Sequence, residues 1–412
     1  MNSLRIAIAI QLLTLFYPAT STADEIDQSI AQHRMGTLIV RAAPGSDVRV
    51  EQTRHEFWFG AALSSGIFRP GNESSDAKKY KQVFLENFNS AVTENAVKWH
   101  SMERRKGDVD YSIVDSILEW ADKNNIPVRG HNLFWGITQF VQPWLRELGT
   151  EELREQVRQR ALSMGKKYKG RFSEYDLNNE MIHGNFYEER LGPEITKQMA
   201  DWFHQEDPDT PLYVNDYDIL TGKRLDDYVK HIRHLLDTGV AIEGIGVQGH
   251  FHGMTFDPKA LQNTLDTLAQ FKLPIRITEF NLPGQLWPYF EDRQRKLTEE
   301  EEKTKAEHLS EYYRICFAHP AVDGILMWGF WEGANWIPVS SLYKRDWTPA
   351  PAAHAYRDLV FNKWWTKFDG KTNTEGICEV PAFYGQYRVT VNGKERTAKL
   401  MKKDGKATVS FE

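Results

Sequence analysis

The sequence predicts an α/β protein whose main domain is a (β/α)8 TIM barrel, with a short β segment before it and a small β appendage after it. Short apolar stretches of strand character alternate with amphipathic helical stretches over most of the chain. The 412 residues are 41% hydrophobic and 26% charged, a globular composition with enough apolar material for a large core. Nearly all the predicted strands end in ionisable, amide or aromatic side chains, as strands do at the mouth of such a barrel.

The barrel prediction depends on eight strands, each followed by a helix. Seven strands are predicted at residues 56–63, 127–134, 173–180, 211–216, 244–250, 274–280 and 322–328. A further short strand, second in the chain, is predicted to end at residues 93–95. The helices are predicted at residues 77–88, 111–123, 151–168, 193–203, 225–236, 261–271, 298–317 and 351–361. The seventh helix begins with Thr298 and Glu301 in a capping-box spacing. The strands are not repeats of one another, so only their pattern supports this count.

The N-terminus predicts export. A short basic start precedes the apolar run Ile6–Ala19, and small residues at 21–23 form a cleavage site before Asp24. This pattern is typical of a secretory signal peptide over residues 1–23, and the run is too short to span a bilayer comfortably. We therefore expect cleavage near Ala23 and a secreted, periplasmic or extracellular protein without a membrane anchor.

Two β segments flank the expected barrel at residues 57–361. Residues 24–56 are predicted as an N-terminal β extension, with strands around Leu38–Val40 and Val48–Val50. Residues 362–412 are predicted as an appendage with a hairpin turn at Asn392–Gly393. The appendage could close the end of the barrel or bind sugar, and its short length favours the first role.

Composition and motifs exclude several classes of function. The net charge is −6 with no basic block, which argues against binding to nucleic acid or an anionic membrane. The chain lacks metal-ligand spacings, a phosphate loop and a nucleophilic serine motif, so we expect no metal and no cofactor. Cys316 and Cys378 lie far apart in sequence, and their pairing stays open. We expect a monomer.

Glu180 lies at the end of the fourth predicted strand, in the stretch SEYDLNNEMIH at residues 173–183. Taken alone, this carboxylate is better explained as a surface or capping glutamate than as a catalyst. His131 and His250 could likewise be core histidines. However, a core strand gains nothing from ending in an ionisable group, and nearly all eight do so. The convergence of these ends favours a catalytic pocket.

Glu180 and Glu279 are the two carboxylates best placed for paired acid–base chemistry. They follow the fourth and seventh strands, on opposite sides of a barrel mouth. The chain also has 13 tryptophans, a residue type that stacks on sugar rings, although core packing explains most of them. Two facing carboxylates beside such rings are what glycoside hydrolysis requires.

Seven segments at the predicted strand ends resemble glycoside hydrolase family 10, the endo-1,4-β-xylanase family, in order and placement. They are TENAVKW (93–99), RGHNLFW (129–135), DLNNE (176–180), YVNDY (213–217), GVQGH (246–250), ITEF (277–280) and WGFWEGANW (328–336). The resemblance extends from about Phe57 to Phe361, and the flanking β segments resemble those of plant-type and related bacterial members.

The resemblance implies a retaining enzyme that cleaves xylan or xylo-oligosaccharides by double displacement. Glu180 would be the acid/base and Glu279 the nucleophile. Asn179 and His131 would bind hydroxyls of the sugar at the cleaved bond, while Gln248 and His250 would position the nucleophile. The remaining implied substrate-binding residues are Glu94, Asn95, Lys98, Trp135, Tyr217, Trp328 and Trp336.

Two positions depart from the family pattern. Many members have a histidine where this chain has Gly136, which is expected to leave a more open subsite. Asn281 stands where the family usually has an aspartate paired with the residue matching His250. A neutral partner should make His250 harder to protonate and shift the pH optimum. A related β-glycanase on another glycan and a non-catalytic glycan-binding protein remain alternatives, although both glutamates are present.

Overall fold

The computed structural model describes residues 22–411, so all but the end of the predicted signal peptide lies outside the described residues. Parallel strands form one closed sheet, in which β5 pairs with both β4 and β7. The strand segments are β3 (Trp58–Leu63), β4 (Ser90–Thr93), β5 (Val128–Gly130), β6 (Phe134–Trp135), β7 (Glu174–Asn179), β8 (Leu212–Asp216), β9 (Gly244–Val247), β10 (Ile275–Phe280) and β11 (Val322–Met327). Because β5 and β6 together occupy the third position, this is an eight-stranded barrel, as predicted.

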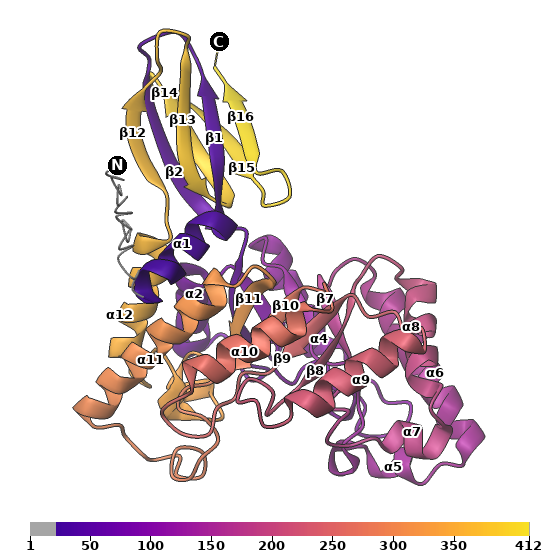
Figure 1. Cartoon of the computed structure of the whole chain (residues 1–412). Helices are drawn as coiled ribbons and strands as arrows, with labels where there is room; N and C mark the ends of the chain where they lie inside the picture. Colours follow the sequence, from indigo (N-terminus) through magenta and orange to yellow (C-terminus); the bar gives the residue numbers. More distant parts are fainter. Residues whose placement is uncertain (1–21, 412) are drawn as a thin grey trace, which may run out of the picture.

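Helices surround the barrel (Figure 1). The main ones are α2 (Ser75–Asn87), α4 (Ser112–Lys123), α6 (Thr150–Tyr168), α8 (Ile195–Glu206), α9 (Leu225–Asp237), α10 (Pro258–Ala269), α11 (Glu299–Ala318) and α12 (Pro351–Asp358). Short helices lie in the loops: α3 (Trp99–Met102), α5 (Pro143–Arg146), α7 (Phe186–Leu191), the 3-10 turns η1 (Thr138–Phe140), η2 (Glu332–Ala334) and η3 (Pro338–Ser340), and the π-helical turn η4 (Leu359–Lys363). The predicted capping box is present at α11, where Thr298 and Glu301 bond each other's backbone N–H.

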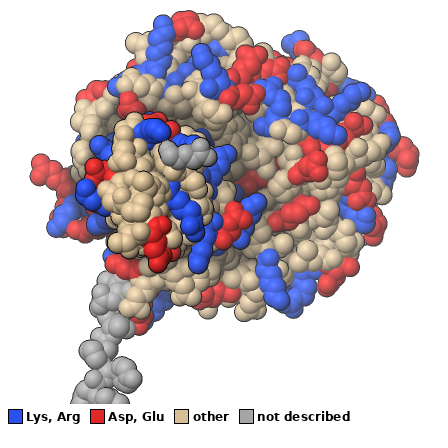
Figure 2. Space-filling model, turned by 90° about the horizontal axis from the view of Figure 1, so that it is seen from above, with Lys and Arg blue, Asp and Glu red and all other residues tan. Residues whose placement is uncertain are grey.

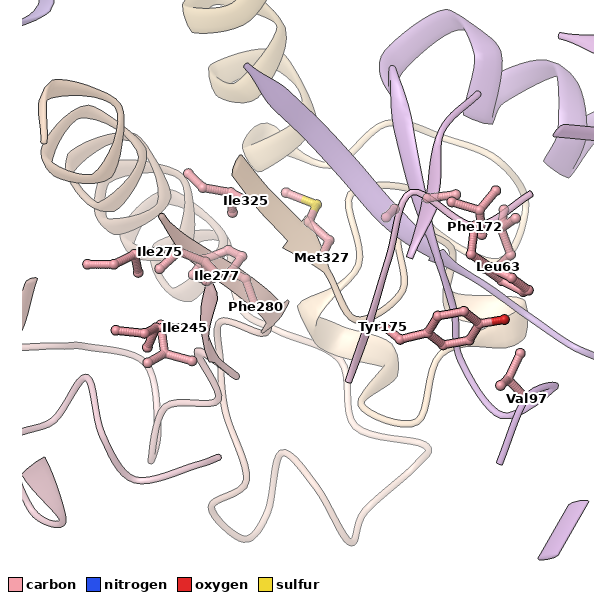
Figure 3. Packing of buried hydrophobic residues seen from close by; sticks show 14 of the residues in the cluster. Leu63, Val97, Phe172, Tyr175, Ile245, Ile275, Ile277, Phe280, Ile325 and Met327 are labelled. Carbon is pink, nitrogen blue, oxygen red and sulfur yellow. The ribbon is translucent and has the colours of Figure 1, made fainter. Parts of the chain in front are cut away.

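Apolar side chains of the strands pack into one continuous core between the sheet and the helices. Figure 3 shows part of it, where Ile275 and Ile277 of β10 lie close to Ile245 and Ile325 of the neighbouring strands. All four side chains are buried completely. Burial on both faces explains why these strands read as nearly continuous apolar runs that stop only at their carboxyl ends. The polar residues that follow are therefore collected at one rim of the barrel.

The two flanking segments combine into one β domain. One sheet has the order β13 (Ile377–Phe383), β1 (Met35–Arg41), β16 (Lys406–Ser410). The other has the order β12 (Lys367–Lys371), β2 (Asp47–His55), β14 (Gly385–Val391), β15 (Lys394–Leu400). A second apolar cluster fills the space between them. Viewed from this end of the molecule, basic and acidic residues are interspersed over much of the surface (Figure 2).

Helix α1 (Thr22–Arg34) joins the β domain to the barrel (Figure 1). The Arg34 side chain is buried and donates hydrogen bonds to the carbonyls of His319 and Val322. Its guanidinium also lies 4.8 Å from the ring centre of Phe57. Since Val322 begins β11, the β domain is anchored at the amino ends of the barrel strands, opposite the rim that carries the polar residues.

Several other features of the described residues bear on the sequence predictions. Cys316 and Cys378 are both free and buried, one in the barrel core and one in the β domain. No helix between residues 22 and 411 is long and apolar enough to cross a bilayer. In the same range, no three His, Cys, Asp or Glu side chains are grouped so that they could hold a metal ion.

Candidate active site

Glu180 directly follows β7 and has a left-handed backbone conformation, with φ of 61°. Its N–H donates to the carbonyl of Asn215 at 2.9 Å, which continues the pairing of β7 with β8 for one more residue. A left-handed glutamate is uncommon, and such conformations are concentrated at functional sites. The turn brings the carboxyl group between two donors from different strands.

Those donors are the indole N–H of Trp135 and the side-chain amide of Gln248, each 2.8 Å from a Glu180 carboxyl oxygen. Burial raises the pKa of Glu180 to about 7, and the negative charges of Glu279 and Asp216 add to the rise, although both hydrogen bonds oppose it. At neutral pH a substantial fraction of this carboxyl group therefore carries a proton, which a general acid requires.

Glu279 lies near the end of β10 and is buried. Its carboxylate accepts hydrogen bonds from the amide of Asn215 at 2.9 Å and from His250 Nε2 at 3.2 Å. Burial alone would raise its pKa. The charge of His131, the hydrogen bond and charge of His250, and the Lys98 ammonium together lower it to about 2. Glu279 is therefore ionised at neutral pH, in contrast to Glu180.

A hydrogen-bonded amide relay orients the residue before Glu180. Asn215 donates to the side-chain oxygen of Asn179 at 3.0 Å and accepts from the hydroxyl of Thr278 at 2.7 Å. The side-chain N–H groups of Asn179 are thus left for a different acceptor, such as a sugar hydroxyl. Asn215 lies in the segment YVNDY (213–217) but was not among the predicted site residues, and the structure shows that it contacts both Asn179 and Glu279.

A chain of ionisable side chains runs inside the barrel toward Glu279. Glu174 and Asp176 of β7 both pair with the fully buried guanidinium of Arg129. Asp176 also accepts a hydrogen bond from His131 Nδ1 at 2.7 Å, and this nitrogen lies 3.8 Å from a Glu279 carboxyl oxygen. Neither Asp176 nor Arg129 was among the predicted site residues. A charged residue within an otherwise apolar, buried strand is the sequence signal that could have identified them.

Aromatic rings and Lys98 surround the two carboxylates. Lys98 Nζ lies 4.6 Å from the ring centre of Trp135 and 5.7 Å from that of Trp328. The Trp328 ring meets His131 edge-on at 5.0 Å, and the Trp336 ring lies 5.1 Å from His250. The predicted tryptophans thus contact the predicted polar residues, and they supply flat apolar surfaces at which a sugar ring can stack.

Three more of the predicted residues follow barrel strands at the same rim, Glu94 and Asn95 after β4 and Tyr217 after β8. Tyr217 stacks on His183, with ring centres 3.7 Å apart, and His183 in turn bonds Asp216 at 2.7 Å. Burial raises the pKa of Glu94, and its charge interacts with Lys98. Asn95 follows Glu94, and its carbonyl accepts a hydrogen bond from the Lys98 N–H at 3.3 Å. His183 was not selected in the sequence, where nothing distinguishes it from a surface histidine.

Gly136 does not open the site as the sequence analysis expected. It is buried, and a Cβ atom there would meet the carbonyl oxygen of Gly184 at 3.2 Å and the backbone N of Phe186 at 3.5 Å. The Gly136 carbonyl accepts a hydrogen bond from Phe186 N–H at 3.0 Å. The glycine therefore permits close packing of two backbone segments that follow Trp135 and Glu180, and no free space corresponds to the missing side chain.

Gly184→Ala should disturb this packing, because its Cβ would lie 2.5 Å from the Ile137 side chain and 3.0 Å from the Ile137 Cα. We expect a loss of about 1–3 kcal/mol in the free energy of unfolding. Thermal and urea unfolding measure it. Gly66→Ala is the matched control, since its Cβ would meet only the Ser64 hydroxyl, at 3.9 Å. Equal effects of the two substitutions would contradict the close-packing role.

A closed parallel barrel with one partly protonated and one ionised carboxyl group among tryptophans at its carboxyl rim is the arrangement typical of a (β/α)8 glycoside hydrolase. The profile of glycosyl hydrolase family 10 matches residues 51–359. The chain therefore belongs to glycosyl hydrolase family 10.

Two curated relatives are similar to most of this chain. The chain is 32% identical over 351 residues to endo-1,4-beta-xylanase 1 of Arabidopsis thaliana, and the matched region covers 84% of this chain and 34% of the relative. It is 34% identical over 376 residues to anti-sigma-I factor RsgI6 of Acetivibrio thermocellus, and that matched region covers 89% of this chain and 46% of the relative. The chain thus spans less than half the length of either relative.

Solved structures share the fold. Xylanase 10B of Thermotoga petrophila in complex with xylobiose is 25% identical, with a TM-score of 0.67, and the match covers 75% of this chain and 95% of that one. Native xylanase 10B of Thermotoga maritima gives 25% identity and a TM-score of 0.66, covering 75% and 96% of the two chains.

Proposed function

We propose that this protein is a secreted, retaining endo-1,4-β-xylanase in which Glu180 is the acid/base and Glu279 the nucleophile. The observation that carries the proposal is the divergence of the two carboxyl groups, with pKa values of about 7 for Glu180 and about 2 for Glu279. Xylanase names among the relatives and a xylobiose complex among the similar structures support xylan as the substrate.

The ionisation of Glu279 favours direct attack over activation of a water molecule. A carboxylate with a pKa of about 2 is a weak base, so it would remove a proton from water poorly. It can still form an ester bond to the anomeric carbon. Hydrogen bonds from Asn215 and His250 hold it in one orientation. These properties suit the nucleophile of a retaining enzyme better than the base of an inverting one.

In the first step, Glu180 would donate its proton to the glycosidic oxygen while a Glu279 oxygen attacks the anomeric carbon. The carbon–oxygen bond to the leaving sugar breaks, and a covalent glycosyl ester on Glu279 forms. The hydrogen bonds from Trp135 and Gln248 fix the Glu180 carboxyl group during this transfer. The N–H groups of Asn179 would bind the 2-hydroxyl of the reacting sugar.

In the second step, Glu180 acts as a base. Esterification removes the negative charge of Glu279, and that charge helps to raise the pKa of Glu180. The pKa of Glu180 therefore falls once the intermediate forms, which keeps the group ionised and able to take a proton from water. The water oxygen attacks the anomeric carbon, the ester bond breaks, and Glu279 is regenerated as a carboxylate.

Glu279→Gln should lower the pKa of Glu180 in the same way, without any bound sugar. It removes the charge at Glu279 and retains the shape, so the pKa of Glu180 should drop below its value of about 7. Carbon-13 NMR of glutamate carboxyl groups measures it, with the Glu180 signal identified by Glu180→Gln. Glu375→Gln, at an exposed turn of the β domain, is the control and should leave the titration unchanged. An unchanged Glu180 titration in Glu279→Gln would refute the charge coupling.

The product profile tests the substrate. Purified protein is incubated with arabinoxylan, mixed-linkage β-glucan and cello-oligosaccharides, and the products are separated by length. The proposal expects short xylo-oligosaccharides from internal cleavage of arabinoxylan. Preferential cleavage of β-glucan would assign a different β-linked glycan, while binding without cleavage would indicate a glycan-binding protein.

A further inference from the structure

The loop that carries Trp336 is connected to the catalytic strand through Asn281, two residues after Glu279. The indole N–H of Trp336 donates to the side-chain oxygen of Asn281 at 3.0 Å. The side-chain amide of Asn281 donates to the hydroxyl of Ser340 at 2.8 Å. The Asn281 side chain is thus held between two residues of one loop, and only 2% of its surface is exposed.

In this arrangement the single hydroxyl proton of Ser340 is used within its own turn. Its hydroxyl donates to the carbonyl of Ile337 at 2.8 Å, so its oxygen can only accept from other groups. It accepts from Asn281 and, at 3.3 Å, from Asn335. An amide at position 281 satisfies both contacts at once, because it offers an acceptor to Trp336 and a donor to Ser340. A carboxylate offers no donor, so the Ser340 hydroxyl would have to turn away from the Ile337 carbonyl, which also accepts the Ser340 backbone N–H at 3.0 Å.

The loop is fixed from its other side as well. Lys305 of α11 is buried and donates to the carbonyls of Val339 at 2.9 Å and Ser341 at 3.1 Å. Asn335 donates to the Ser341 hydroxyl at 2.9 Å. Trp336 is therefore part of a continuous polar network in which Asn281 accepts the hydrogen bond of the indole, while the Phe290 ring packs edge-on against it at 5.1 Å.

His250 is free of Asn281 in this arrangement. Its Nε2 bonds Glu279, whereas its buried Nδ1 has no hydrogen-bond partner among the described residues. The backbone N–H of Asn281 donates to the carbonyl of Gly249, the residue before His250, at 3.3 Å, and among the described residues no hydrogen bond joins the two side chains. The Trp336 ring still lies 5.1 Å from the His250 ring. Displacement of Trp336 would thus alter the wall beside the nucleophile.

We propose that Asn281 is a positioning residue that holds Trp336 in place as a wall for the bound sugar, and that the loop requires an amide here. This role rests on the proposed function, since the sugar is the substrate of that site. Asn281 would act through Trp336 and would not contact the substrate. Loss of the contact should therefore weaken substrate binding more than it slows the chemical step.

The kinetic test uses Asn281→Leu, which keeps the shape and removes both hydrogen bonds, on an aryl xylobioside. We expect KM to rise about 5- to 30-fold, with kcat changed less than about 3-fold. In a Trp336→Ala background, the same substitution should change KM less than about 2-fold. An unchanged KM, or an equal rise in both backgrounds, would overturn the proposal.

A second test does not depend on activity. Protein labelled with nitrogen-15 tryptophan gives one indole N–H signal that disappears in Trp336→Phe, and its hydrogen exchange is measured. Asn281→Leu should accelerate this exchange at least about 10-fold. Asn281→Asp keeps the acceptor for the indole but loses the donor to Ser340, so an intermediate acceleration is expected. Equal exchange in the wild type and Asn281→Leu would overturn the contact even if xylan is not the substrate.

Discussion

Replacement of Glu279 by alanine should lower kcat/KM on xylo-oligosaccharides about 10⁵-fold or more. The substitution removes the group that forms the covalent bond, and no other ionised carboxylate is held by both Asn215 and His250 within the described residues. Initial rates of xylotetraose cleavage measure the effect. Circular dichroism and thermal unfolding of the variant confirm that the barrel remains folded.

Rescue of Glu279→Ala by azide tests the nucleophile role more specifically. The alanine variant leaves a space beside the anomeric carbon in which a small anion can attack. Azide should restore turnover of a 2,4-dinitrophenyl xylobioside, and the product should be the α-glycosyl azide, with inverted configuration. Glu375→Ala is the matched control and should retain full activity without azide. Residual hydrolysis near the wild-type rate in Glu279→Ala would contradict its role as nucleophile.

Glu180→Ala should have the second largest effect, and the loss should depend on the leaving group. For xylotetraose, whose leaving sugar needs a proton, kcat/KM should fall about 10²- to 10⁴-fold. For a dinitrophenyl xylobioside, which leaves without protonation, kcat/KM should fall by much less. For the dinitrophenyl substrate, kcat should drop, because the second step loses its base and the covalent intermediate accumulates. Steady-state kinetics on both substrates separate the two effects.

The pH profile supplies a second criterion for Glu180. In the wild type, the pKa of about 7 places the alkaline limb of kcat/KM near neutrality, since activity is lost as the proton leaves. The pKa of about 2 for Glu279 places the acid limb far below it. In Glu180→Ala, the alkaline limb should disappear for the dinitrophenyl substrate. Equal losses on both substrates, or an alkaline limb that persists, would mean that the roles are assigned wrongly.

Local pattern in the sequence predicted the barrel because each strand is buried on both faces and ends abruptly in polar residues. Ile275 and Ile277 are fully buried, and Glu279 follows within the same strand. Such a pattern needs no knowledge of distant contacts. It also identified Glu180, although only the combination with the other strand ends made a catalytic role more plausible than a capping one.

Contacts between distant segments could not be predicted in this way. The N-terminal and C-terminal β segments form one domain because β1 pairs with β13, from Met35 opposite Phe383 to Arg41 opposite Ile377. Neither strand carries a local signal for its partner. The helix α1 also lacked a distinct pattern, and its Arg34 finds its acceptors in the loop before β11 and at the start of that strand.

Substitutions relative to a family pattern proved hardest to interpret from the sequence. Gly136 was interpreted as a lost side chain, whereas its Cβ direction is filled by the backbone of Gly184. Asn281 was interpreted through the histidine it might have paired with, and the structure instead gives it Trp336 and Ser340 as partners. For Gly136 the missing information was the direction in which a Cβ atom would point, and for Asn281 it was the direction of the side chain. Both depend on the loops around the residue.

Trapping of the covalent intermediate would identify the nucleophile itself. The protein is incubated with 2,4-dinitrophenyl 2-deoxy-2-fluoro-β-xylobioside, digested with protease and examined by mass spectrometry. The fluorine slows both steps, and the activated leaving group lets the first proceed, so the ester should accumulate. We expect one adduct per molecule on the peptide that contains Glu279, with loss of activity in proportion. An adduct on another carboxylate, or full turnover with inverted product and no adduct, would contradict it.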